Sequence, residues 1–423
     1  MNTEIPFIKY PELLKQLENS ENNHLLLGNG FNSSLGIDTN YENIFSRMLK
    51  EEPVYENIEK EMQKESVGYD IEKLIGELEE SLKSENENVD KFLNAYIRRK
   101  IKFDFMKATS GIVREKIKGI YQEKNRDIHV LFEKFDNYFT LNYDTFLYLL
   151  LMKFKEPYGT KNQAVAISNT NLFQREDLNE TQNNIYDEIY KAKKEGKIEI
   201  AIGKKPTRVA LKNATKSHFQ TNIEQYKKEE EKEWSTEDIR RVIDKIWEEE
   251  AENQKLKTVN DGFQGDLFKE QEILQNVFFL HGSFHIYEKK HLIKKITKEK
   301  NQALYQRLAE IIQGDEESIV CILAEDSEEK TKQIDDNQYL KKGFKRLFEL
   351  SGNIVILGSS LSDNDKHIFQ AINESSVETV YISSRKEKKQ KDFKQSEKLF
   401  PKKKIVLFDY KTISYDVNNV EAK

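Results

Sequence analysis

The chain has 423 residues, and its 68 Lys and Arg against 74 Asp and Glu leave a formal net charge of −6. This balance gives no overall attraction to nucleic acid or to an anionic membrane surface, so we expect neither as a direct partner. At about 150 residues per domain the length predicts two or three domains, and 24 Phe and 19 Tyr are enough to build their cores. Cys321 is the single cysteine, which excludes an intrachain disulfide and a Cys-rich zinc site and fits a reducing, cytoplasmic compartment.

The N-terminal segment MNTEIPFIKYPELL lacks a basic head followed by an apolar run. No stretch of the chain reaches the roughly 18 apolar residues that a membrane span needs. The sequence therefore predicts a protein that is neither secreted nor membrane-spanning.

Seven short apolar runs are predicted to be strands. They are rich in β-branched and aromatic residues without polar alternation, which is typical of strands buried on both faces. The runs are HLLLGNGFN (24–32), YFTLNYD (138–144), VFFLHGSF (277–284), SIVCILAED (318–326), NIVILGSSLSDND (353–365), TVYISS (379–384) and KIVLFDY (404–410). Because helical stretches separate them, the predicted fold is α/β, a doubly wound parallel Rossmann-like sheet with large helical insertions.

Two insertions interrupt the predicted sheet domain. Residues 41–131 carry apolar residues three and four apart and are expected to form a helical insertion after the first strand. Residues 159–258 are charged and mainly helical, and Ser235 three residues before Asp238 marks a helix start. This second insertion is either a surface for a partner or self-association, or a surface elaboration without function. The sheet domain then consists of residues 1–40, 132–158 and 259–423.

Parallel sheets bind ligands at the carboxyl ends of their strands, so we expect the chemistry just after each apolar run. The first run ends in GNGFNSSLG (28–36). Gly28 and Gly30 permit a tight turn and a close approach to phosphate, while Asn32 and the serines after it can cap a helix. The spacing differs from the usual G-x-G-x-x-G, so a purely structural strand-to-helix turn is an equal alternative.

The second and third runs end in residues suited to catalysis. Asn142 and Asp144 are two residues apart, so we expect both side chains to point into the same crevice. Capping of the next helix by Asp144 is the alternative. His281 ends the third run, where the pKa of an imidazole suits general-base chemistry near neutral pH. The alternative there is a satisfied core histidine.

The run that ends at Leu357 is followed by GSSL. Gly358 permits a close approach, and the hydroxyls of Ser359 and Ser360 can bind phosphate or ribose. Asp363 and Asp365 are expected to cap the helix that follows.

Two further segments receive plainer interpretations. The acids of AED (324–326) are expected to start a helix, and the basic run SRKEKKQKDFKQ (384–395) is expected to be a solvated face. Neither is predicted to form part of a site.

The order of these motifs resembles that of the sirtuin family. The family's first loop, G-A-G-x-S-x-x-x-G-I, is in register with Gly28, Gly30, Gly36 and Ile37. Its T-Q-N-x-D is matched by TLNYD (140–144), its H-G-S-F by HGSF (281–284) and its late G-T-S-L by GSSL (358–361). The resemblance covers about residues 20–45, 135–150 and 275–385.

The chain also departs from the sirtuins that deacetylate lysine. Those enzymes carry four zinc-binding cysteines, whereas this chain has one cysteine in all, so no metal is expected. DTNY (38–41) replaces P-D-F-R after the first loop, Leu141 replaces the Gln, and Asn32 replaces the Ser. A zinc-less sirtuin-like core with helical insertions resembles bacterial anti-phage, abortive-infection proteins in which this domain hydrolyses NAD.

The resemblance implies a regulated NAD+ hydrolase that releases nicotinamide and ADP-ribose. Asn142 would orient the ribose or a water, His281 would accept a proton, and Asp144 would fix the nicotinamide pocket. The residues near the pyrophosphate would be Gly28, Asn29, Gly30 and Asn32, and those near the adenosine half Gly358, Ser359 and Ser360. Because uncontrolled hydrolysis would kill the host, the resemblance also implies a homo-oligomer or a sensor partner such as a HerA-type ATPase.

Other functions remain compatible with the sequence. One is a module that senses a nucleotide, such as an ADP-ribose derivative, without cleaving it. Another is hydrolysis of a different nucleotide, because the missing Arg and Gln reshape the pocket. A scaffold with a degenerate pocket is the third.

Overall fold

The structure is a computed structural model, and it divides the chain into two compact units. Its described residues are 5–18, 20, 22–57, 60, 73–74, 88–122, 134–155, 178–194, 216–253, 260–272, 275–297, 304–313, 317–323 and 327–415. The first unit consists of residues 1–147, 262–271 and 277–423, and the second of residues 148–261 and 272–276. None of the helices in the described ranges combines the length and apolar character that a membrane crossing requires.

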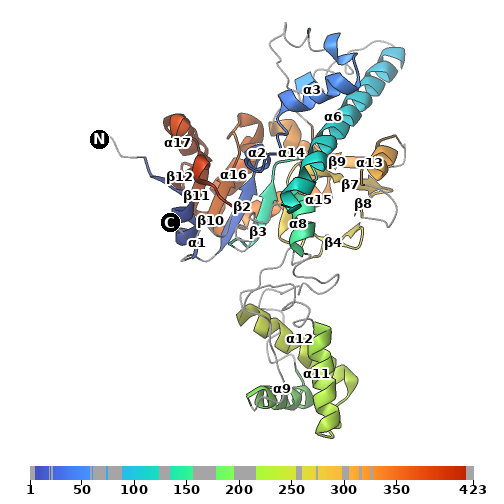
Figure 1. The fold of residues 1–423 in the computed structure, drawn as a ribbon, viewed down its shortest axis with the longest axis vertical. Coiled ribbons are helices and arrows are strands. Elements are labelled where there is room, and N and C mark those ends of the chain that lie inside the picture. Colours follow the sequence, from blue (N-terminus) through green and yellow to red (C-terminus); the bar gives the residue numbers. More distant parts are fainter. Residues whose placement is uncertain are drawn as a thin grey trace. The chain divides into compact units, whose positions relative to one another are not determined.

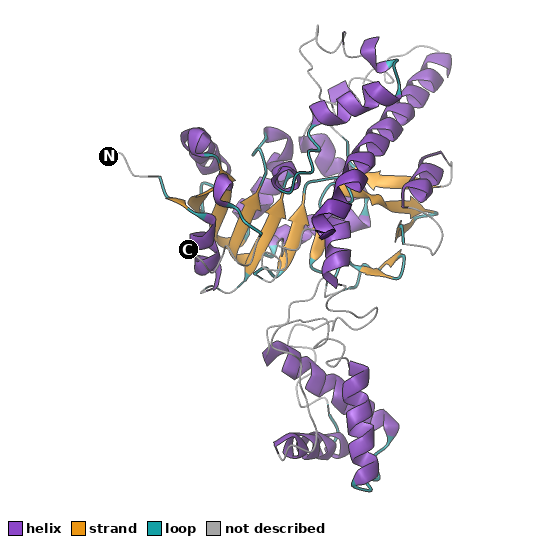
Figure 2. Cartoon of the chain, in the orientation of Figure 1, coloured by secondary structure: helices purple, strands orange, loops and turns teal. Residues whose placement is uncertain are grey.

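A seven-stranded parallel sheet forms the centre of the first unit (Figures 1 and 2). Its strand order is β1-β12-β11-β10-β2-β3-β6, and every neighbouring pair is parallel. The strands are β1 (Phe7–Ile8), β2 (Asn23–Leu27), β3 (Asn137–Thr140), β6 (Val277–Phe279), β10 (Ser351–Leu357), β11 (Ser376–Ser384) and β12 (Lys404–Asp409). The predicted α/β class with a parallel sheet flanked by helices is confirmed, and the arrangement is compatible with a Rossmann-like fold.

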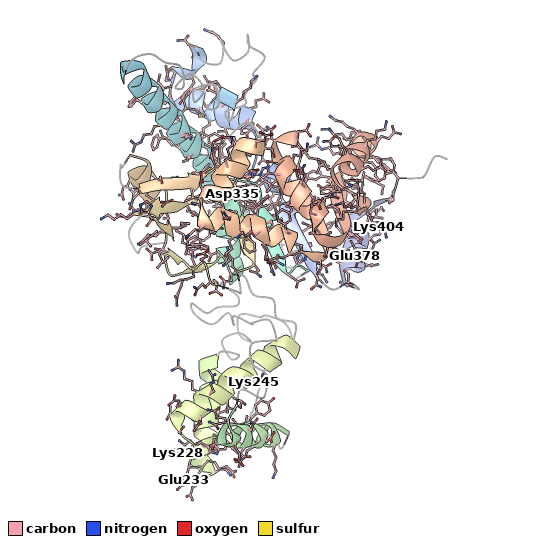
Figure 3. All side chains as sticks on the ribbon, turned by 180° about the vertical axis from the view of Figure 1, so that it is seen from behind. Lys228, Glu233, Lys245, Asp335, Glu378 and Lys404 are labelled. Atoms are coloured by element: carbon pink, nitrogen blue, oxygen red, sulfur yellow. The ribbon has the colours of Figure 1, made fainter. Side chains whose placement is uncertain are left out.

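The direction of chain order reverses between β2 and β10. From β2 the sheet continues through β3 and β6 on one side, whereas β10, β11 and β12 extend on the other. In open α/β sheets a reversal of this kind leaves a crevice outside the carboxyl ends of the strands, where ligands bind. Figure 3 labels Glu378 and Lys404 near the beginnings of β11 and β12, which is the opposite, amino edge of the sheet.

The core lies around the central strands because their side chains are apolar on both faces. Every residue of β2 and β3 is buried, and the rings of Phe139 and Phe278 stack with centroids 5.2 Å apart across β3 and β6. Four helices pack against other strands of the sheet: α15 (Gln338–Phe348) against β6, α16 (Lys366–Glu374) against β11, and α1 (Tyr10–Glu18) and α17 (Lys389–Leu399) against β12. The unbroken apolar runs are therefore explained by layers on both sides of the sheet.

A second sheet of five antiparallel strands corrects one prediction. Its order is β4-β5-β8-β7-β9, with β4 (Phe263–Gln264), β5 (Leu267–Phe268), β7 (Gly282–Lys289), β8 (Leu292–Lys295) and β9 (Glu317–Cys321). The run 318–326 was expected in the parallel sheet, but β9 pairs antiparallel with β7; residues 324–326 lie outside the described ranges. Gly282 redirects the chain after β6 at φ +77, where an added Cβ would lie 2.0 Å from the Val320 carbonyl oxygen.

The two inserted segments have their described helices in different units. In the first unit, α3 (Tyr41–Glu51) packs on α6 (Asn88–Gln122), which also contacts α13 (Leu304–Gln313). The second unit contains α9 (Glu180–Lys194), α11 (Lys216–Glu229) and α12 (Thr236–Asn253). The predicted start of α12 is confirmed, because the Asp238 backbone N–H donates to Ser235 Oγ at 3.0 Å.

Candidate functional site

A cavity of about 730 Å³ lies at the carboxyl edge of the parallel sheet, over the point where strand order reverses. Ligand sites for small molecules and cofactors occupy roughly 300–1,000 Å³. The predicted site residues that line it are Gly28, Asn29, Gly30, Asn142, Asp144, His281, Gly358, Ser359 and Ser360. Asn32 is buried and contacts two of these lining residues, as described below.

The first glycine loop leads from β2 into α2 (Asn29–Ser34) and packs directly against the Gly358 loop after β10. The expectation that Asn32 and the serines after it cap this helix is wrong, because they lie inside α2 and Gly28 occupies its cap position. The Gly28 N–H donates to the Leu357 carbonyl at 2.9 Å, and the Gly30 N–H donates to the Gly358 carbonyl at 2.8 Å. A Cβ on Gly30 would lie 2.7 Å from the Gly358 Cα, and Gly358 itself has φ +77, with an added Cβ only 2.3 Å from the Phe31 nitrogen. These glycines are therefore required by backbone contact between β2 and β10, whatever the cavity binds.

Asn142 and Asp144 are joined through one intermediary, Asn32. Asn142 Nδ2 donates to Asn32 Oδ1 at 3.1 Å and to the Gly28 carbonyl at 3.3 Å. Asn32 Nδ2 in turn donates to Asp144 Oδ2 at 2.7 Å. The predicted pair thus shares one network with the first glycine loop.

The carboxyl group of Asp144 caps a helix, and its pKa is raised. Its Oδ1 accepts the N–H of Phe146, the first residue of α8 (Phe146–Lys155), at 2.8 Å, so the capping alternative is correct for one oxygen. Burial raises the pKa of Asp144 to about 6, against the lowering effect of the Phe146 and Asn32 hydrogen bonds. A carboxyl group titrating near neutrality inside a cavity is typical of functional sites.

Thr39 closes the same network from the far side of the first loop. Thr39 Oγ1 donates to Asn29 Oδ1 at 2.6 Å and accepts from Asn32 Nδ2 at 3.1 Å. Asn29 Nδ2 donates to the Thr39 carbonyl at 2.8 Å. The DTNY segment (38–41) therefore supports the loop through a threonine hydroxyl.

The HGSF segment holds the loop that carries Asn142 and Asp144. Ser283 Oγ donates to the carbonyl oxygens of Tyr143 at 2.9 Å and Asp144 at 3.2 Å. The Phe284 N–H donates to the same Tyr143 carbonyl at 3.0 Å. Two motifs that are far apart in sequence are thereby fixed to each other.

His281 lies at the base of the cavity and is only 1% exposed. Its Nε2 is 3.4 Å from His367 Nε2, and His367 Nδ1 is 2.9 Å from Ser327 Oγ. Burial and the positive charge of Lys330 hold the pKa of His281 well below its usual value, while a hydrogen bond with the Leu141 backbone opposes the shift. The predicted imidazole is therefore neutral at pH 7 and belongs to a buried chain of polar side chains.

Lys330 and Asp365 complete this buried cluster. Lys330, on α14 (Ser327–Asp336), is 2% exposed, and its Nζ lies 3.3 Å from Asp365 Oδ1. The same Asp365 oxygen lies 3.7 Å from His281 Nε2. Asp365 does occupy the N-cap position of α16 as expected, but its side chain makes no capping hydrogen bond to the helix. The nearby Lys330 and His281 offer its carboxylate charged and polar partners instead. Asp363 does not cap α16, because it begins the short turn η2 (Asp363–Asp365), which Ser362 caps.

The cavity has a basic end that the sequence interpretation missed. Arg385, Lys388 and Lys391 line it, at the start of the run that was expected to be a solvated face. Arg385 directly follows β11, so the same rule that selected the other strand ends applies to it. Lys388 and Lys391 follow at intervals of three residues, which places them on the same side of a helical turn.

The comparisons with known proteins add one match. Residues 246–410 match a domain of unknown function, DUF4917. This range contains His281, Lys330, Asp365, His367 and the basic end of the cavity, but neither the first glycine loop nor Asn142 and Asp144. No curated protein matches the chain.

The site is suited to bind a polar organic ligand that carries negative charge. Amide, hydroxyl and backbone groups line the middle of the cavity. The carboxyl groups of Asp144 and Asp365, the buried imidazole of His281 and the Lys330 ammonium lie at one end, and Arg385, Lys388 and Lys391 lie at the other. Among the described residues, no group of three or more His, Cys, Asp or Glu side chains is arranged to hold a metal ion.

Proposed function

We propose that the protein hydrolyses NAD+ to nicotinamide and ADP-ribose, using this cavity as a sirtuin-like active site. The observation that carries the proposal is the convergence of four sequence-distant motifs at the switch point of a parallel sheet. Asn142 and Asp144 are hydrogen-bonded to the first glycine loop through Asn32, and the HGSF segment fixes their backbone. That is the arrangement expected if these residues act on one substrate.

The reaction breaks the bond between C1′ of the ribose and the nicotinamide nitrogen. Nicotinamide leaves as a neutral molecule with the bonding electron pair, positive charge develops on the sugar, and a water adds to C1′ and loses a proton. Asn142 is suited to orient the ribose or the water, because its Nδ2 is held by Asn32 and Gly28 while its Oδ1 accepts no hydrogen bond from the described residues. The negative charge of Asp144 favours the cationic sugar.

His281 is the proton acceptor in this proposal. It is neutral at pH 7 and is therefore able to take a proton, and the Asp365 carboxylate lies 3.7 Å from its Nε2, opposite in charge to the imidazolium that results. A positioned general base contributes about 10²–10⁴-fold to a rate.

The test is release of free nicotinamide from NAD+ by the purified chain. Asn142→Ala is expected to lower the rate by at least 100-fold, and the thermal midpoint is expected to stay within a few degrees because Asn142 is only partly buried. Ser33→Ala, an exposed lining residue with no assigned role in binding, is the matched control and is expected to keep most of the activity. Parent-like NAD+ consumption by Asn142→Ala would reject the assignment.

A second candidate, a nucleotide-binding sensor without hydrolysis, is favoured by one specific observation. His281 is 1% exposed and its Nε2 faces His367, which leaves this imidazole poorly placed for direct contact with a ligand. The sensor predicts that ADP-ribose binds with no release of nicotinamide under any condition, which the same assay measures.

Regulation is part of the proposed function because unregulated hydrolysis would exhaust the NAD+ of the cell. As the resemblance implies, we propose an anti-phage role in which self-association or a partner protein controls the activity. Light scattering at micromolar protein, alone and with the product of a neighbouring gene, tests this. A strict monomer in both samples would contradict it.

A further inference from the structure

The basic end of the cavity indicates which dinucleotide the site takes. We propose that Arg385, Lys388 and Lys391 bind a phosphate on the adenosine ribose, so that the preferred substrate is the 2′-phosphorylated dinucleotide NADP+. This inference rests on the proposed function for the orientation of the ligand, and it adds a specificity determinant that the sirtuin resemblance does not contain.

The position of the three cations follows from the order of the strands. The reacting end of the cavity lies after β3 and the cations lie after β11, with β2 and β10 between them. Adjacent strands are about 4.8 Å apart, so three spacings separate the two ends by about 14 Å. A dinucleotide whose nicotinamide ribose lies at Asn142 therefore extends its adenosine half toward Arg385.

The charges at this end fit an added phosphate better than a ribose hydroxyl. Recognition of an unmodified ribose in Rossmann-like sites uses an acidic side chain after a strand, whereas a nearby Arg accommodates a 2′-phosphate. Here β11 is followed directly by Arg385. One carboxylate, that of Asp392, lines this end, and its Oδ2 already accepts the Ser384 hydroxyl at 2.6 Å.

The three cations have no salt-bridge partner at close range. Within the described part of the chain, Arg385, Lys388 and Lys391 form no salt bridge, although the charge of Arg385 contributes to the lowered pKa of Glu387 nearby. Their neighbours differ: Lys411 pairs with Glu387, and Lys389 lies over the Phe7 ring. The cations that line the cavity are therefore available for a dianion.

Arg385 is also positioned by the first glycine loop. Its guanidinium lies over the Tyr410 ring, 5.7 Å from the centroid, and Tyr410 Oη donates to the Gly30 carbonyl at 2.8 Å. This stacking holds a planar, bidentate donor beside the loop that faces the ligand, which suits phosphate recognition. Tyr410 therefore connects the basic end of the cavity to the first glycine loop through a single side chain.

The experiment separates phosphate recognition from catalysis by using ligands without nicotinamide. Calorimetry measures the binding of adenosine 2′,5′-bisphosphate, adenosine 3′,5′-bisphosphate and AMP to the full chain. The 2′,5′-bisphosphate is expected to bind at least tenfold more tightly than the other two, because hydrogen bonds to charged groups are the strong ones. Arg385→Ala is expected to remove that difference, whereas Lys394→Ala, an exposed lysine of α17 outside the cavity, keeps it.

Hydrolysis is measured in parallel with NAD+ and NADP+. The expected result is a kcat/KM at least tenfold higher for NADP+, which Arg385→Ala reduces to the NAD+ value. Equal affinity for the two bisphosphates, or an Arg385→Ala variant that weakens AMP and adenosine 2′,5′-bisphosphate alike, would overturn the inference.

The two proposals fail in different ways. If nicotinamide is released equally from both dinucleotides and no 2′-phosphate preference is found, the specificity inference is wrong and the hydrolase stands. If the 2′-phosphate preference is found but neither dinucleotide is cleaved, the hydrolase is wrong and the phosphate site stands.

Discussion

Nε2 of His281 lies 3.4 Å from Nε2 of His367, inside the buried cluster beneath the cavity. Burial lowers the pKa of His367 to about 3 and that of His281 well below its usual value. Both imidazoles are therefore neutral in the folded protein at pH 7, and one ring donates a hydrogen bond that the other accepts. Protonation of both would place two like charges beside Lys330.

The free energy of unfolding should fall in acid because of these two residues. In the unfolded chain a histidine binds a proton near pH 6.5, whereas His367 resists it down to about pH 3. Between these values the unfolded state binds more protons, so His367 removes about 1.4 kcal/mol of stability per pH unit lowered. The pKa of His281 is also held low, so this residue acts in the same direction. Asp144 works in the opposite direction, because its raised pKa of about 6 makes the folded state the better proton binder below that pH.

Urea unfolding at pH 7.5, 6.5, 5.5 and 4.5 measures the net effect of these three groups on the free energy of unfolding. The expected outcome is a net loss of stability on acidification, because two histidines act against one carboxyl group. His367→Gln should reduce the slope with pH, because glutamine does not titrate at this position. An unchanged slope in His367→Gln would show that other groups control acid unfolding.

Asn32 is predicted to set the charge of Asp144. Its Nδ2 donates to the buried carboxylate at 2.7 Å and favours the ionised form. Asn32→Ala should therefore raise the pKa of Asp144 further above 6, moving the acid limb of the activity profile to higher pH. Loss of a hydrogen bond to a charged group should also cost about 1.5–3 kcal/mol of stability.

Ser33→Ala is the matched control for Asn32→Ala, since Ser33 is the next residue, is exposed and lines the same cavity. Its activity profile is expected to keep the parent acid limb. A parent-like pH profile in Asn32→Ala would remove Asn32 from the role of a positioning residue.

Lys330 and Asp365 should behave as a buried ion pair. The lysine side chain is 3% exposed and the carboxylate 17%. Removing one partner of a buried pair typically costs about 3–5 kcal/mol, because the other charge is left without compensation. Lys330→Met should therefore destabilise the protein more than the double variant Lys330→Met/Asp365→Asn. Thermal or urea unfolding of the two single variants and the double variant measures the coupling, and simple additivity would contradict it.

The contact between the two glycine loops makes a steric prediction. Gly30→Ala places a Cβ 2.7 Å from the Gly358 Cα, backbone against backbone, so β2 and β10 would have to separate. Gly36→Ala meets nothing within 4 Å, and its cost is limited to the left-handed backbone at φ +75, about 1–2 kcal/mol. Gly30→Ala should therefore lower the unfolding free energy more than Gly36→Ala and abolish nucleotide binding. Equal stability of the two variants would mean that the loops can move apart at little cost.

Parallel sheets bind ligands at the carboxyl ends of their strands, and this rule accounts for most of the site residues that could be predicted from the sequence. It placed Asn142 and Asp144 at the cavity because unbroken apolar runs identify buried parallel strands, whose carboxyl ends meet at one edge. The same rule, applied to the run 379–384, points to Arg385, but the many lysines after it resemble an ordinary solvated face. The segment was interpreted from its lysine content, although its position directly after a strand points to the cavity.

His367 and Lys330 could not have been found in this way. His367 belongs to α16 and Lys330 to α14. Their positions in these helices do not indicate that either residue contacts His281, which follows β6. Their proximity to His281 arises from the packing of helices over the sheet, which a single sequence does not specify. The run 318–326 failed for a related reason: apolar composition predicts a buried strand but not which sheet contains it, and β7 provides an edge for it.

The central position of β2 has a consequence for how the chain is made. β2 is paired on one side with β3, but its other neighbour, β10, is synthesised only after both insertions and the antiparallel sheet. Until then the nascent chain presents an apolar strand edge that is able to pair with other chains. Native assembly of the carboxyl edge of the sheet therefore has to wait for the last quarter of translation, and a ribosome that stops early releases a fragment that lacks the cavity and is prone to aggregate.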